Sequence, residues 1–246
     1  MITIKSAEQI ALMKESGKIT KGVLELIGKS IKPGISTLEL DKIAYDYITS
    51  RGGVPSFLGY GGYPNTLCVS IDDMVVHGIP SKDIILKEGQ IVSVDVGTIL
   101  NGWQSDAART FPVGEISSEK QKLIEVTKQC FFKAIENLRD GTPLGNIGNA
   151  VQTHAETNGF SVVRAMVGHG IGRELHEDPQ VPNYGRKGAG VRLRRNMTLA
   201  IEPMVNMGSH HVIVDGLNCV TKDGLPSAHY ENTVVITDNG VEILTV

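Results

Sequence analysis

The sequence has few cysteines, no long apolar run and no strong excess of one charge. Its three cysteines, Cys68, Cys130 and Cys219, are far apart and form no CxxC pair. This argues against a disulfide scaffold or a zinc knuckle and indicates reduced thiols. No run of about 18 apolar residues occurs, so we expect no membrane span. Lysines and glutamates interrupt the first 16 residues, which argues against a signal peptide. These absences together predict a cytoplasmic protein.

Several function classes are disfavoured as well. With 24 basic and 27 acidic residues the net charge is −3, and no basic cluster exceeds Arg192–Arg195, so nucleic acid is not an expected ligand. The chain has no GxSxG elbow and no P-loop. What remains is an ordinary globular composition, with 41% hydrophobic residues among 246. Because no Ser- or Pro-rich linker interrupts the chain, we expect one domain over residues 1–246.

Capping signals and hydrophobic spacing predict two pairs of helices. The four helices are expected to open at Ser6, Ser36, Ser118 and near Ile147, and to end at Pro33-Gly34, Gly52-Gly53, Gly141 and Asn158-Gly159. Apolar β-rich runs predict strands at Leu67–Ser70, Ile91–Val96, Ala107–Val113, Phe160–Arg164, Met197–Ile201, His211–Val214, Asn232–Ile236 and Val241–Leu244. Two helices followed by strands thus occur twice. This order favours an α+β fold with helices on one side of a mostly antiparallel sheet.

The sharpest local signal is Asn101-Gly102, because both residues of a type I′ hairpin turn need positive φ. If these residues form the turn, Gly97 lies opposite Asp106, and Asp95 shares the face of Asp106. Their β-carbons should then be about 7–8 Å apart, which two divalent ions could bridge. The alternative is that both aspartates are solvated beside a turn. Against that alternative, Asp95 lies within an apolar strand, where an unpaired carboxylate is disfavoured.

Other candidate ligands occur farther along the chain. His169 lies between glycines in Gly168–Gly172, where a lone histidine could equally be structural. Glu202 and Glu231 adjoin apolar β-rich runs, where each could also be a solvated strand-end charge. Together with the two aspartates they make four carboxylates and one imidazole. That sulfur-free set suits a pair of first-row divalent ions.

The ordered set closely resembles the type I methionine aminopeptidase family within the M24 metallopeptidases. The resemblance also includes His77 in Val76–Pro80 and His176 beyond the glycine run, and it covers nearly the whole chain. It implies the pita-bread fold, in which two pseudo-symmetric halves place helices outside a curved antiparallel sheet. Only 29 positions separate Glu202 from Glu231, which leaves no room for the type II insertion, and no zinc-binding extension precedes the first helix. A bacterial-type enzyme is therefore expected.

The resemblance implies the chemistry residue by residue. Its metal ligands would be Asp95, Asp106, His169, Glu202 and Glu231, holding two divalent ions of Co, Mn, Fe, Ni or Zn. Water activated by both ions would attack the first peptide bond, with Glu202 as the proton shuttle. His176 would stabilise the oxyanion and His77 would bind the substrate backbone. The implied activity is removal of N-terminal methionine from nascent proteins when the second residue is small and uncharged.

The resemblance also implies partners and a pocket. The partner would be the N-terminus of a nascent polypeptide, with the ribosome as a further candidate, and the chain is expected to be a monomer. Tyr60, Tyr63 and Cys68 fall on matching positions of the pocket for the methionine side chain. Two positions depart from the family pattern: Phe57 replaces an expected cysteine and Leu217 replaces an expected tryptophan. An Xaa-Pro peptidase and a non-catalytic binding protein of the same fold remain the alternatives.

Overall fold

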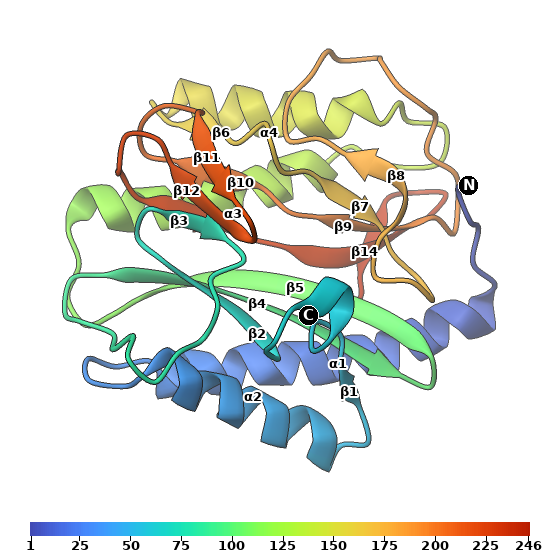
Figure 1. The fold of residues 1–246 in the computed structure, drawn as a ribbon. Coiled ribbons are helices and arrows are strands. Elements are labelled where there is room, and N and C mark those ends of the chain that lie inside the picture. Colours follow the sequence, from blue (N-terminus) through green and yellow to red (C-terminus); the bar gives the residue numbers. More distant parts are fainter.

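The computed structural model describes residues 1–246 and contains two consecutive pairs of helices (Figure 1). The helices are α1 (Ala7–Ser30), α2 (Thr37–Ser50), α3 (Ser118–Ile135) and α4 (Gly145–Thr157). Capping boxes at Ser6 and Ser36 open the first two helices, as predicted. The third prediction was wrong by one residue, because Ser117, not Ser118, accepts the capping hydrogen bond from Lys120.

The first half of the chain builds a four-stranded antiparallel sheet in the order β1-β4-β2, with β5 on β4. Its strands are β1 (Val54–Pro55), β2 (Leu67–Ile71), β4 (Ile91–Leu100) and β5 (Trp103–Pro112). The β4–β5 hairpin turns at Asn101 (φ 52°) and Gly102 (φ 76°). Gly97 pairs with Asp106, so the predicted register is confirmed.

The second half builds a five-stranded sheet in the order β15-β14-β9-β7-β8. Its strands are β7 (Gly168–Gly170), β8 (Glu177–Val181), β9 (Thr198–Ile201), β14 (Asn232–Ile236) and β15 (Val241–Ile243). Two small sheets and one 3-10 turn complete the fold. They comprise β6 (Ser161–Val162), β10 (Met204–Asn206) and β13 (Ser227–His229); β3 (Met74–Val76), β11 (Val212–Asp215) and β12 (Asn218–Thr221); and η1 (Tyr60–Gly62).

Each half has its own apolar core between its helices and its sheet. In the first half, side chains of α1 and α2 such as Ile27 and Leu40 pack with Val92 and Val94 of β4. In the second half, side chains of α3 and α4 such as Phe131 pack against the strands of the second sheet. The two helix pairs therefore lie on opposite outer sides of the molecule, with the strands between them (Figure 1). This arrangement is the expected α+β pita-bread fold.

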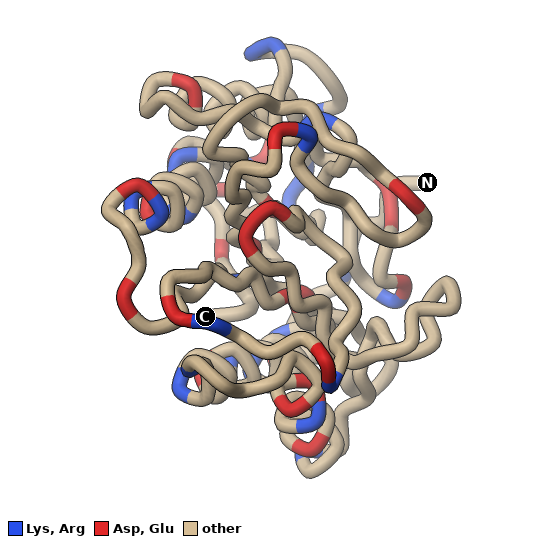
Figure 2. The backbone as a smooth tube through the Cα atoms, turned by 60° about the vertical axis from the view of Figure 1, so that its left-hand side comes forward, with Lys and Arg blue, Asp and Glu red and all other residues tan.

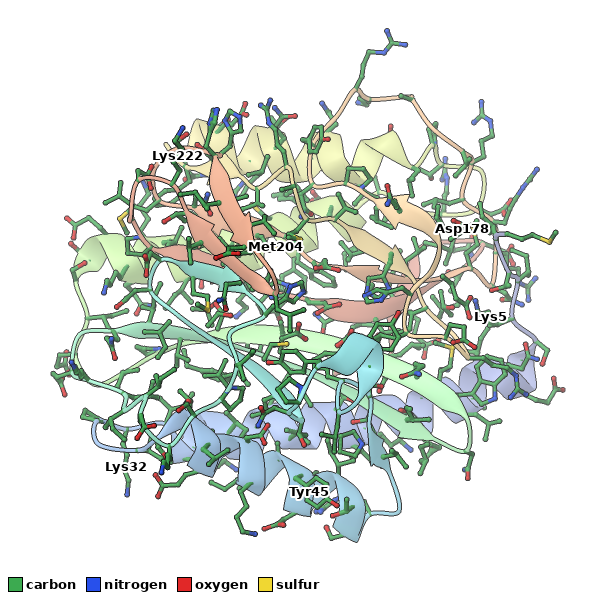
Figure 3. The ribbon with its side chains drawn as sticks, in the orientation of Figure 1. Lys5, Lys32, Tyr45, Asp178, Met204 and Lys222 are labelled. Carbon is green, nitrogen blue, oxygen red and sulfur yellow. The ribbon has the colours of Figure 1, made fainter.

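The surface agrees with the mixed charge of the sequence. Figure 2 shows Lys and Arg interspersed with Asp and Glu along the outer helices, without a continuous basic segment. Tyr45 on the outer side of α2 is among the exposed apolar side chains (Figure 3). None of the helices combines the length and the apolar character that crossing a bilayer requires.

Candidate metal centre

A cavity of about 230 Å³ is lined by residues from both halves of the chain. Every residue that the sequence placed in the site lines it, with Gly61, Leu175 and Leu217 in addition. The predicted residues on its wall are Phe57, Tyr60, Tyr63, Cys68, His77, Asp95, Asp106, His169, His176, Glu202 and Glu231. Residues up to 174 positions apart in the sequence thus meet in one place.

The two halves join where β5 lies antiparallel to residues 229–233. Ala108 and Glu231 exchange backbone hydrogen bonds of 2.9 Å and 3.4 Å across this junction. Two residues along, the backbone N–H of Asp106 donates to Thr233 Oγ1 at 2.9 Å. On its other side, the same segment lies antiparallel to residues 201–204. Asn232 pairs with Ile201 and His229 pairs with Met204, so one continuous register runs along both pairs of strands. Glu202 therefore stands opposite Glu231 between the two ladders.

These pairings place the candidate ligands in two neighbouring rows on one face of the curved sheet, because paired residues and residues two apart share a face. One row runs through Cys68, Asp95, Ala108, Glu231 and Glu202. The next runs through Gly97, Asp106, Thr233, Ala200 and His169. The alternative of solvated aspartates is wrong, since Asp106 is only 4% exposed.

The side chains converge as the rows predict. Donor atoms of Asp106, His169 and Glu231 lie within 4.8 Å of one another. Glu202 Oε1 is 3.6 Å from His169 Nε2. His169 Nδ1 lies 2.9 Å from the backbone oxygen of Gly170, so Nδ1 donates and the Nε2 lone pair faces the carboxylates. His169 therefore has the tautomer of a ligand.

The close packing of neighbouring strands requires glycine on both sides of His169. A β-carbon on Gly168 would lie 2.4 Å from the backbone oxygen of Ala200, and one on Gly170 would lie 2.1 Å from that of Asp178. The two glycines let β7 sit closely between β8 and β9, and this packing fixes His169.

Burial raises the pKa of all four carboxyl groups, and repulsion between carboxylates adds to this effect for Asp106, Glu202 and Glu231. Burial is the main cause, and it raises the pKa of Asp95 to about 7. The pKa values of Asp106, Glu202 and Glu231 are raised further above their ordinary range, because each also faces other carboxylates. Burial first, and then the nearby His176, lower the pKa of His169 to about 4. The cluster therefore holds more buried negative charge than the protein itself neutralises.

The residues present fit divalent cations. Oxygen atoms of Asp95, Asp106 and Glu231 are buried without any hydrogen-bond partner, an arrangement that native proteins avoid unless another group satisfies the atom. The donors are hard oxygens and one imidazole nitrogen, as first-row divalent ions prefer. Cys68, opposite Asp95, has its pKa raised by burial and by that carboxylate, so it is a neutral thiol.

The two accessory histidines lie on the cavity wall, and burial lowers the pKa of both. His176 Nδ1 is 2.7 Å from Tyr60 Oη, and its ring lies edge-on to His169 with centroids 4.3 Å apart. The next residue, Glu177, pairs with the buried Lys5 at 2.6 Å. Figure 3 shows Lys5 at the same edge of the molecule as Asp178. This buried ion pair anchors the segment that carries His176.

The sequence analysis missed one polar residue beside the centre. His229 Nε2 lies 3.7 Å from Glu202 Oε2 and 3.9 Å from Glu231 Oε2, and burial lowers its pKa to about 3. Its position two residues before Glu231 in an extended segment was the available signal. Leu175, which lines the apolar side of the cavity, had no signal of its own. Tyr63 turns its hydroxyl to the backbone oxygens of Leu67 and Gly78, both at 2.9 Å.

Comparison with known proteins identifies the class. Residues 11–238 match the model of metallopeptidase family M24. A methionine aminopeptidase of Clostridium acetobutylicum is 53% identical over 100% of this chain and 99% of its own length, and methionine aminopeptidase 1 of Bacillus subtilis is 48% identical with the same coverage. The crystal structure of methionine aminopeptidase from Thermotoga maritima superposes with a TM-score of 0.98 at 46% identity, covering 100% of this chain and 99% of that one.

A buried carboxylate and histidine cluster on this fold defines a metal-dependent hydrolase. The chain belongs to metallopeptidase family M24, and the family resemblance seen in the sequence is confirmed. Its high-identity relatives within that family are the bacterial methionine aminopeptidases.

Proposed function

We propose that this protein removes the N-terminal methionine from polypeptides whose second residue is small and uncharged. The observation that carries the proposal is the cavity itself, which joins four buried carboxylates and His169 to an apolar wall that includes Phe57, Cys68 and Leu175. Such a pocket holds an uncharged side chain beside a group of metal ligands. An unbranched thioether fits apolar surroundings of this kind.

Asp95, Asp106, His169, Glu202 and Glu231 would hold two divalent ions, with Co, Mn, Fe, Ni or Zn as candidates. The diagonal placement of the two aspartates and the opposed glutamates supports a pair of ions instead of one. When bound, the ions would supply Lewis acidity, which lowers the pKa of water and polarises a peptide carbonyl. Because ligands come from both halves, we propose that residues 1–246 act as one catalytic domain.

Glu202 is the proposed proton shuttle. Burial first, and then Asp95 and Asp106, raise the pKa of this carboxyl group well above its ordinary range, which favours proton uptake by Glu202. The amide of Asn183 donates to the backbone oxygen of Glu202 at 2.9 Å and holds the end of β9 in place. Glu202 can therefore take a proton on one side of the scissile bond and release it to the leaving amine.

His176 and His77 are the proposed substrate-binding histidines. If the Tyr60 hydroxyl donates to His176 Nδ1, the ring proton stays on Nε2, where it can be donated to the developing oxyanion. His77, which has φ 64° and a pKa lowered by burial, is neutral and can hydrogen-bond the substrate backbone. Phe57 and Leu217 border the same cavity, and both replace residues expected from the family.

The substrate would be the N-terminus of a nascent chain, so we place the activity in the cytoplasm and expect a monomer; ribosome contact is part of the same proposal. The test removes metal from the purified protein and restores Mn, Fe or Co in turn. Mass spectrometry then follows the peptides Met-Gly-Ser, Met-Lys-Ser and Ala-Pro-Ser. We expect metal-dependent loss of methionine from Met-Gly-Ser alone.

The other outcomes separate the alternatives. Cleavage of Ala-Pro-Ser only would make the protein an Xaa-Pro peptidase. Cleavage of Met-Lys-Ser at a similar rate would contradict the proposed requirement for a small second residue. No cleavage with any metal would contradict the proposal and favour a binding protein.

A further inference from the structure

His229 is the buried polar side chain nearest the centre that the proposed mechanism does not use. Its Nε2 atom is enclosed and has no hydrogen-bond partner. Two carboxylate oxygens face it, Glu202 Oε2 at 3.7 Å and Glu231 Oε2 at 3.9 Å. A buried ring nitrogen without a partner is rare in native proteins and calls for an explanation.

The backbone fixes this ring from both sides. The N–H of His229 donates to Thr110 Oγ1 at 2.9 Å, and the same hydroxyl donates to the backbone oxygen of His229 at 2.9 Å. On the opposite side, β13 pairs His229 with Met204 of β10, which Figure 3 labels inside the upper half. Since Thr110 and Met204 continue the sheet one row beyond Glu231, His229 points to the same face as the ligands.

Glu202 thus lies between two imidazole rings, and their tautomers can be compared. His169 approaches Oε1 at 3.6 Å with its lone pair, because its proton is on Nδ1. A second lone pair facing Oε2 would repel the carboxylate, whereas an N–H there would attract it. A neutral imidazole carries one proton, and the two carboxylates therefore favour its position on Nε2 of His229.

We propose that His229 donates its Nε2–H to Glu202 and Glu231 and so holds both carboxylates in the orientation that the metal centre needs. This positioning role deepens the proposed function and rests on it. An approach of about half an ångström brings the nitrogen within hydrogen-bond distance of Glu202. Partners that orient ligating carboxylates in this way typically contribute about 10–100-fold to metal affinity or activity.

Metal binding tests the proposal without relying on turnover. We expect His229→Leu to weaken Mn²⁺ and Co²⁺ binding to the metal-free protein by about 10–100-fold in calorimetric titration. His229→Gln should retain the wild-type affinity, because its amide can donate in place of the ring. His154→Leu is the matched control, since His154 lies on α4 away from the cavity and its side chain makes one hydrogen bond, to Gln129 at 3.0 Å.

A second measurement needs no variant to fold. In zinc-loaded wild-type protein with ¹⁵N-labelled histidine, long-range proton–nitrogen spectra should show the proton of His229 on Nε2. Wild-type affinity in His229→Leu, equal weakening in the Leu and Gln variants, or an unprotonated Nε2 would each overturn the proposal. If the wild-type protein itself binds no metal, the proposed function fails instead, which keeps the two failures distinct.

Discussion

The two halves of the molecule contribute to the site by different means. The first half presents Asp95 and Asp106 from one hairpin with two strands of 10 residues, paired locally through Asn101-Gly102. The second half presents His169 from β7, Glu202 from the residue after β9 and Glu231 from the residue before β14. These strands have three to five residues, and the pairings of β9 with β7 and with β14 join segments about 30 residues apart in sequence. The ligand positions of the first half thus depend on local sequence. Those of the second half depend on long-range strand pairing, which requires the whole fold.

Neither half alone contains all the residues of the centre. The hydrogen bonds between Ala108 and Glu231 bring the two ligand groups into register. Each half alone would bury like charges without a counter-charge, which is costly. Cations bound by the proposed ligands of both halves would offset that cost, so metal affinity and the junction should depend on each other.

The largest expected effect comes from removing one ligand in either half. Asp106→Asn and Glu231→Gln keep the shape of the side chain and remove its charge. Each should lower kcat/KM for Met-Gly-Ser by more than the roughly 100-fold upper range of a lost outer-sphere partner. Because burial already disfavours the charge, the metal-free variants should be at least as stable as metal-free wild type in urea.

Asp46→Asn is the control for both variants, since this carboxylate lies on the exposed side of α2 and pairs only with Lys42. It should leave activity unchanged. Full activity in Asp106→Asn but not in Glu231→Gln, or the reverse, would show that one half holds the centre by itself. That result would contradict the proposal that both halves supply ligands.

Metal removal comes next in size. Metal at 100 times its dissociation constant should stabilise the protein by about 2.7 kcal/mol relative to the metal-free form. Without metal, stability should fall as pH rises, because the pKa of Asp95 is raised from 3.8 to about 7 and the pKa values of the other three carboxyl groups are also raised well above their ordinary range. The folded state holds protons that the unfolded chain releases, so this stability is present below pH 4 and is lost through pH 7 and above.

The histidines limit the pH window in which this loss can be measured. The lowered pKa values of His169 and His229 oppose the trend below about pH 6.5, where the unfolded chain takes up protons first. Urea unfolding between pH 6.5 and 8.5, followed by Trp103 fluorescence and far-ultraviolet circular dichroism, therefore reports mainly on the carboxylates. Burial also raises the pKa values of the three thiols, which adds a smaller loss of stability in the same direction near pH 8.5. Metal-free stability that stayed constant or rose over this range would contradict the assignment.

The same difference between the halves explains how much the sequence could predict. The capping boxes at Ser6 and Ser36, the hairpin turn and its register follow from residues that are neighbours in the chain, and these predictions are confirmed. Strands β1, β3, β7, β8, β10, β12 and β13 were missed because each is short, and β1, β7 and β8 also contain proline or glycine. Their extended form comes from tertiary pairing, as the tight fit of Gly170 against Asp178 shows.

The candidate site divides in the same way. Residue types, their order and the family resemblance were enough to select the candidate ligands that line the cavity, whereas their roles as metal ligands and in catalysis remain predictions. His229 was missed because its significance depends on the register Met204↔His229, which aligns two strands that local sequence does not reveal. Leu175 was missed for a similar reason, since nothing local distinguishes it from a core leucine.

Glycine-to-alanine substitutions in the β4–β5 and β11–β12 turns should have smaller effects that differ between the two turns. Gly102→Ala places a side chain at φ 76° and should cost about 1–2 kcal/mol of stability. Its metal affinity should persist, because the whole β4–β5 ladder keeps Asp106 in register. Gly216→Ala imposes the same strain at φ 60° in the β11–β12 turn, and neither glycine has a close neighbour that an added β-carbon would overlap.

The second turn is next to Leu217, which lines the cavity. Gly216→Ala should therefore alter KM for methionyl peptides more than it alters the urea midpoint, whereas Gly102→Ala should do the opposite. Steady-state kinetics and unfolding curves on both variants test this pairing. Equal effects on KM would show that the second hairpin does not shape the pocket.

The smallest effect concerns a hydrogen bond that crosses between the halves. Tyr60 comes from the first half and meets His176 of the second at 2.7 Å. Tyr60→Phe removes the proposed donor to Nδ1, so the ring no longer keeps its proton on Nε2. A single hydrogen bond of about 0.5–1.5 kcal/mol corresponds to a decrease in kcat of at most about tenfold. Metal affinity should not change, because neither residue is a proposed ligand.

The double variant tests this route. His176→Ala should lower kcat more than Tyr60→Phe does, and combining the two should lower kcat no further, because the tyrosine acts only through the imidazole. An additive loss of kcat in the double variant would mean that Tyr60 contacts the substrate directly.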